Sequence, residues 1–72
     1  MNAPSWVPKL VAETRAARIR TADKGIATRV DRGLIQIVRI EWLKSGAGIA
    51  HPLTDYVDGP SAIAFLQSMG NE

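Results

Sequence analysis

The sequence contains no cysteine and only one histidine, His51, among its 72 residues. Without cysteine the chain can form neither a disulfide bond nor a thiolate metal site, and one histidine supplies too few ligands for the usual zinc sites. Zero cysteines are typical of proteins in a reducing compartment, so we expect a cytoplasmic protein. We also expect it to bind no metal and no other cofactor.

The sequence has no apolar run near the roughly 20 residues that a membrane-spanning helix needs. Its start, MNAPSWVPKL, lacks the charged beginning and long apolar centre of a signal peptide. We therefore expect a soluble protein with one domain over residues 1–72, in which residues 1–4 fray. A core this small rarely supplies more than about 3–5 kcal/mol of net stability. Since no disulfide or metal can add to it, we expect a homodimer.

Basic residues are missing after Lys44. Nine basic and four acidic residues give residues 1–44 a net charge of +5, whereas residues 45–72 carry three acids and a net charge of −3. This asymmetry has two interpretations. It is either an ordinary mixed surface, or the basic half meets an acidic partner, which is nucleic acid or an acidic protein surface.

The densest apolar run, LIQIVRIEWL, spans residues 34–43 and predicts the central strand of an antiparallel sheet. Four of its ten residues are β-branched, and a glycine precedes it. A helix is the competing interpretation. Side chains of a strand alternate between two faces. One face is apolar except for Gln36, and we expect it to be the core face. Its members are Leu34, Gln36, Val38, Ile40 and Trp42.

Two turn sequences at ten-residue spacing predict a meander around this strand. Ala22-Asp23-Lys24-Gly25 and Asp31-Arg32-Gly33 combine an early aspartate with a final glycine, as tight hairpin connections do. They separate predicted strands at 17–22 and 26–30 from the central one. Residues 49–53 are a possible fourth strand, at an edge because of Pro52. The alternative is one helix from 5 to 24 that ends at Gly25 and replaces the first strand.

Helices are predicted at both ends of the chain. The first spans residues 5–16, with Ser5 as its N-cap and Pro8 in its first turn. The second spans residues 59–69, begins after Asp58 and ends at Gly70. We expect the second helix to cover the core face of the sheet at Val38, Ile40 and Trp42, and both tryptophans to anchor the core. The fold class is therefore α+β: a small antiparallel three- to four-stranded meander flanked by an N-terminal and a C-terminal helix.

The sequence contains no recognisable catalytic motif, so we expect that the protein is not an enzyme. His51, Asp55 and Asp58 match no common metal-ligand spacing. The segment from Lys44 to Gly48 superficially resembles a phosphate-binding loop, but such loops place glycine before lysine and a helix after it. No serine stands in a Gly-x-Ser-x-Gly elbow.

The sheet face opposite the predicted core carries the candidate interaction site. Apolar centres with arginine are enriched in protein interfaces, and this face has no aromatic side chain on which bases could stack. The other possibility is that the first helix covers this face and uses its isoleucines internally. The candidate site comprises Arg18, Arg20, Arg29, Ile35, Ile37 and Arg39.

The strand LIQIVRIEWL and the closing helix DGPSAIAFLQSMG give the chain an architecture that resembles small phage or mobile-element inhibitors of host defence, the anti-CRISPR type. The resemblance is architectural, carries no shared motif and assigns no residue a role. It implies a non-enzymatic inhibitor or adaptor that docks on a protein or nucleoprotein complex. The alternative is a small basic nucleic-acid-binding regulator. The two differ in salt dependence, because phosphate binding weakens steeply with added salt.

Overall fold

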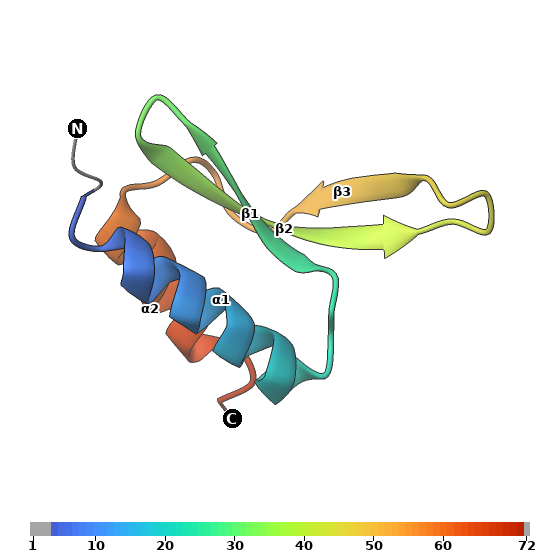
Figure 1. Ribbon diagram of the computed structural model, residues 1–72, viewed down its shortest axis with the longest axis horizontal. Coiled ribbons are helices and arrows are strands. Elements are labelled where there is room, and N and C mark those ends of the chain that lie inside the picture. The colour runs from blue at the N-terminus through green and yellow to red at the C-terminus, as the bar shows by residue number, and fades with distance from the viewer. Residues whose placement is uncertain (1–3, 72) are drawn as a thin grey trace.

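The computed structural model describes residues 4–71 and shows an α+β fold, in which a helix precedes and another follows a small antiparallel sheet and both helices lie on one side of it (Figure 1). The predicted fold class is thus confirmed. The expected fraying concerns residues 1–4, of which residues 1–3 lie outside the described part. The elements in chain order are α1 (Val7–Thr21), β1 (Ile26–Asp31), β2 (Leu34–Trp42), β3 (Gly48–Pro52) and α2 (Gly59–Ser68).

Helix α1 replaces the strand that was predicted at residues 17–22, so that prediction is wrong. The alternative prediction, one helix from 5 to 24, is closer to the observed helix. The alternation of Arg18, Ile19, Arg20 and Thr21 resembles a strand, but the side chain of Ile19 is 76% exposed. The buried stripe of the helix has helical spacing instead, because it consists of Leu10, Thr14 and Ala17. The buried positions of this stripe are therefore three or four residues apart.

The ends of α1 also differ from the prediction. Trp6, and not Ser5, occupies the N-cap position and makes no side-chain capping hydrogen bond, whereas Pro8 lies in the first turn as predicted. The helix ends at Ala22, which adopts the left-handed conformation with φ of 56°. Gly25 lies beyond the helix end, where its N–H donates to the Asp23 carboxylate over 2.8 Å.

The sheet has the order β1-β2-β3, and both pairs are antiparallel. This confirms the predicted pairing of residues 26–31 with the central strand. Arg32 and Gly33 connect β1 to β2, and both have positive φ, as a two-residue type I′ turn requires. Beyond β3, the chain runs back along β2 as far as an isolated bridge between Ile35 and Val57.

Helix α2 begins as the sequence predicts. The Asp58 carboxylate accepts a hydrogen bond from the Ser61 N–H over 3.1 Å, and Pro60 lies in the first turn. The first helical residue, Gly59, is buried against Trp6, whose indole ring occupies the space that a Cβ would need. Gly70 follows the helix with φ of 77°. Neither α1 nor α2 is both long enough and apolar enough to cross a membrane.

The two faces of β2 are the reverse of the prediction. Ile35 and Ile37 are both 0% exposed and belong to the core, whereas Trp42 is 66% exposed and is not covered by α2. The core cluster joins both helices to one face of the sheet. Its members are Leu10, Ala17, Ile26, Ile35, Ile37, Ala62, Ile63 and Leu66, with Trp6, Val57, Phe65 and Met69 packed around them.

Strand register gives the physical reason for this reversal. Residues directly opposite each other in an antiparallel pair point to the same face. Ile26 lies opposite Arg39 and Thr28 lies opposite Ile37. The inward face of β1 therefore coincides with the Ile35–Ile37 face of β2, and Val38, on the predicted core face, points to the other side of the sheet.

Candidate protein-binding face

The side of the sheet that faces away from the helices is largely apolar, and we call it the open face. Its side chains come from alternate positions of all three strands, as the register shows. Val38 at its centre is only 1% exposed and lies outside the core cluster. We define the open face by Ala27, Arg29 and Asp31 of β1, Leu34, Gln36, Val38, Ile40 and Trp42 of β2, and Ala50 and Pro52 of β3.

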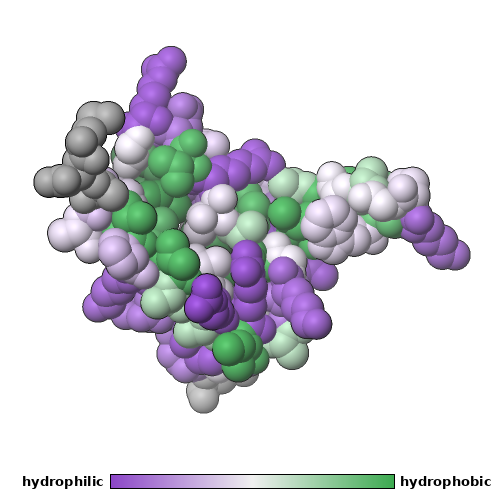
Figure 2. Space-filling model, viewed as in Figure 1, coloured by the Kyte–Doolittle hydropathy of each residue, from purple (hydrophilic) through white to green (hydrophobic). Residues whose placement is uncertain are grey.

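The far ends of β2 and β3 form a hairpin arm, residues 39–51, that projects beyond both helices (Figure 1). The space-filling view shows this arm standing clear of the body of the molecule (Figure 2). Residues 41–49 are all exposed. At the tip, the N–H of Leu43 donates to the carbonyl of Ala47 over 2.9 Å, and Gly46 has φ of 90°. The arm is thus an ordered two-stranded extension.

Trp42 occupies the open-face side of this arm. It lies opposite Gly48, and a Cβ at position 48 would be 3.1 Å from the indole ring and 3.0 Å from Ile40. The glycine therefore lets the ring lie close over the neighbouring strand while its outer side stays in water. A large aromatic side chain fixed in this way and mostly exposed is a typical anchor for a protein partner.

The opposite side of the arm carries one ion pair and one hydrogen-bonded pair, beside the exposed Ile49. Arg39 Nε lies 2.8 Å from Asp23 Oδ2, and His51 Nε2 lies 2.9 Å from Glu41 Oε1. Hydrogen bonds from the Gly25 N–H and then from Arg39 lower the pKa of Asp23. These pairs are solvated, so they contribute modestly to stability.

The arrangement of His51 and the aspartates gives no metal centre in the described part of the chain. His51 pairs with Glu41, whereas Asp58 caps α2. No three histidine, aspartate or glutamate side chains of residues 4–71 come together as a metal ion would need.

The six residues of the predicted interaction site do not form one surface. Ile35 and Ile37 are buried beneath the helices. Among the arginines, Arg29 is exposed on the open face, across from Gln36. Arg39 lies on the opposite face, where it pairs with Asp23.

The other two arginines of that prediction belong to α1 and bind backbone carbonyls. Arg18 Nε donates to the carbonyl of Ile26 over 2.6 Å. Arg20 donates from Nε to the carbonyl of Met69 over 2.9 Å and from Nη2 to that of Leu66 over 2.6 Å. Arg20 therefore ties the end of α1 to the end of α2, a structural role that spacing along the sequence does not reveal.

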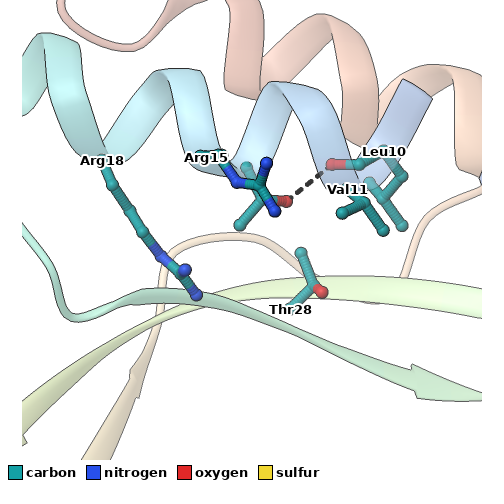
Figure 3. A pocket seen from close by; sticks show the side chains of 6 residues that line it. Leu10, Val11, Arg15, Arg18 and Thr28 are labelled. Atoms are coloured by element: carbon teal, nitrogen blue, oxygen red, sulfur yellow. Dashed lines mark hydrogen bonds between the residues drawn. The ribbon is translucent and has the colours of Figure 1, made fainter. Parts of the chain in front are cut away.

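A groove of about 210 Å³ lies between α1 and β1 (Figure 3). It is smaller than the roughly 300–1,000 Å³ of typical small-molecule sites, so it suits one or two side chains. Sequence reasoning missed this groove, because it exists only where the middle of α1 passes beside an edge strand. Its lining consists of Leu10, Val11, Thr14, Arg15, Arg18 and Thr28.

No protein-family model matches the chain, and searches of curated proteins and of solved structures likewise found no match.

Proposed function

We propose that this protein is a non-enzymatic protein-binding module that contacts its partner through the open face and the hairpin arm. The observation that carries the proposal is the position of Trp42, which is 66% exposed at the junction of these two surfaces. Tryptophan is enriched among the residues that dominate binding energy in protein interfaces. Leu34, 43% exposed, adds apolar area at the other end of the open face.

The charges around this surface favour a partner with an acidic surface. Arg29 lies on the open face, Arg32 in the β1–β2 turn and Lys44 at the arm tip, and all three are exposed. Asp31, at the end of β1, is the acidic residue near them. Two copies of the chain placed face to face would bring these basic groups together, so a different protein fits better than a second copy.

The narrower form of the proposal makes the protein an inhibitor or adaptor, of the phage anti-CRISPR type, that docks on a cytoplasmic host defence nucleoprotein complex. Covering a partner's functional surface requires shape and charge complementarity but no catalytic group. The open face and the projecting arm offer such a surface. A homodimer remains the other use of the same face.

The test compares Trp42→Ala with Ile19→Ala, which removes an even more exposed apolar side chain from α1. Proteins captured from nuclease-treated host lysate are identified and purified, and their binding is then titrated at low and high salt. We expect Trp42→Ala to weaken binding by roughly thirtyfold or more and Ile19→Ala to leave it unchanged. Circular dichroism should be the same for both variants.

Three outcomes would contradict the proposal. Trp42→Ala would bind as tightly as the unmodified protein if the open face took no part in binding. Capture that disappears after nuclease treatment and falls steeply with salt would identify nucleic acid as the partner. A dimer in size-exclusion chromatography that Trp42→Ala dissociates would show that a second copy covers the face.

A further inference from the structure

The groove between α1 and β1 combines apolar and basic side chains. Val11 is 54% exposed beside the buried Leu10, and Arg15 and Arg18 follow along the same side of the helix. Figure 3 shows Arg18 reaching from α1 to β1, with Thr28 on the strand below the helix. No aspartate or glutamate lines the groove. The groove therefore favours a ligand that is partly apolar and negatively charged.

The backbone of β1 along this groove has hydrogen-bonding groups that point away from β2. The carbonyl of Ile37 accepts from Leu53, so this residue of β2 bonds toward the β3 side of the sheet. Thr28, which lies opposite Ile37, therefore directs its own N–H and C=O outward. The same alternation places the carbonyl of Ile26 outward, and it is this carbonyl that Arg18 reaches.

The exposed edge at Thr28 and Val30 can accept another strand. No turn, loop or side-chain hydrogen bond of residues 4–71 uses their backbone groups. We propose that the groove binds an extended acidic segment of a partner protein, which adds to β1 as a fourth strand and directs alternate side chains into the groove. This mode of recognition combines backbone hydrogen bonds for affinity with side-chain pockets for selectivity.

The spacing along α1 suits this ligand. Val11 and Arg15 are four helical residues apart, which is about 6 Å along the axis. Side chains on one face of a strand are two residues apart, or about 6.7 Å. One apolar residue of the segment can therefore contact Val11 while the acidic residue two positions along contacts Arg15. The next residue on the same side of the segment comes near Arg18.

The charges argue against the other two occupants. Antiparallel pairing of β1 with a second copy would bring both copies of Arg15, Arg18 and Arg29 around one axis, where like charges repel. A nucleic acid would satisfy the arginines, but it would leave the outward N–H and C=O of Thr28 and the exposed Val11 without matching partners. An acidic peptide satisfies all of these groups.

The experiment uses a labelled symmetric heptapeptide, acetyl-Ser-Glu-Thr-Val-Thr-Glu-Ser-amide, so that strand direction does not matter. Its affinity for the intact protein is measured by fluorescence anisotropy. We expect saturable binding that weakens roughly tenfold or more when lysine replaces both glutamates, or when Arg15→Glu reverses the charge of the groove. Arg18 is left unchanged because it also holds the carbonyl of Ile26.

Two matched pairs test the added strand itself. Thr28→Pro removes the outward N–H but no bond to β2, and should abolish binding, whereas Thr28→Val keeps the N–H and should bind normally. With the unmodified protein, methylating the backbone nitrogens of the peptide should have the same effect as the proline. The comparison of the methylated with the unmethylated peptide shows whether the peptide adds as a strand, even if Thr28→Pro fails to fold.

Several results would overturn the proposal. The peptide would bind equally well after backbone methylation if it did not form a strand. A thymidine octanucleotide that displaces it and binds more tightly would show that the groove recognises phosphate. A dimer that Thr28→Pro converts to monomers would show that a second copy occupies the edge. No binding at millimolar peptide would also refute it.

Discussion

Ile37 contributes a fully buried side chain to the side of β2 that contacts the helices. Ile37→Asp would place a carboxylate there without a partner, at a cost of several kcal/mol. Since a core of this size rarely supplies more than about 3–5 kcal/mol of net stability, we expect this variant to be unfolded by circular dichroism. Leu34→Asp, on the open face, is the control. It should stay folded at a cost of up to about 1 kcal/mol. A folded Ile37→Asp with native stability would contradict the core described above.

The contact between Gly59 and Trp6 predicts a second sensitive position. A methyl group at position 59 would overlap the indole ring, so the helices or the ring must shift. We expect Gly59→Ala to lower the free energy of unfolding in urea by about 1–3 kcal/mol. In a Trp6→Leu background the same change should cost much less, because the smaller side chain leaves room. Equal costs in both backgrounds would show that the ring is not responsible.

For single residues, the sequence predicted correctly those roles that depend on near neighbours in the chain. The Asp58 cap and the glycine at position 33 follow from chemistry within a few residues of each. The burial of Ile37 and the exposure of Trp42 were predicted wrongly, because both phases of β2 contain isoleucine or valine and the more apolar phase is not the one that packs beneath the helices. That choice depends on the register with β1 and on the return of the chain through Val57 into α2, which are contacts between distant residues.

Among the elements, the hairpin arm is separable from the core. Replacing residues 42–48 with Asn-Gly joins Glu41 to Ile49, which pair directly, through a two-residue turn. We expect circular dichroism and the thermal midpoint to change little, since no residue removed belongs to the core cluster. Partner binding through the open face should be lost, because Trp42 is removed. Retained binding would place the partner elsewhere, and a large loss of stability would show that the arm supports the core.

The extent of α1 shows why elements were predicted unevenly. Residues 18–21 alternate between charged or polar and apolar as a strand does, yet they form the last turn of a helix. What fixes them as helix is the cross-helix bonding of Arg20 to α2 and the packing of Ala17, both tertiary. For α2 and β2, by contrast, local propensity and tertiary contacts agree, and these two elements were predicted nearly to the residue.

For the molecule as a whole, two aspartates predict a loss of stability in acid. Hydrogen bonds from Ser61 lower the pKa of Asp58, and those from Gly25 and Arg39 lower that of Asp23. The unfolded chain then takes up protons at a higher pH than the folded one. Stability should be constant above the unfolded pKa of about 3.9 and decline as pH falls through the lower folded values.

Thermal unfolding followed by circular dichroism from neutral pH to pH 2 measures this effect. Asp58→Asn keeps a capping oxygen but removes the titrating group, so its midpoint should fall less steeply in acid than that of the unmodified protein. Identical acid profiles for the two proteins would show that Asp58 does not contribute.

The bond from Arg18 to the Ile26 carbonyl has a consequence for polymerisation. A fibre grows only if each strand that is added leaves an equally receptive edge behind it. On β1 the guanidinium already occupies one outward carbonyl, and on β3 Pro52 has no N–H to offer. The two borders of the sheet are therefore unlike and each is interrupted, which disfavours pairing of β1 of one copy with β3 of another. Both interruptions therefore oppose the repeated edge-to-edge addition by which an amyloid fibre grows.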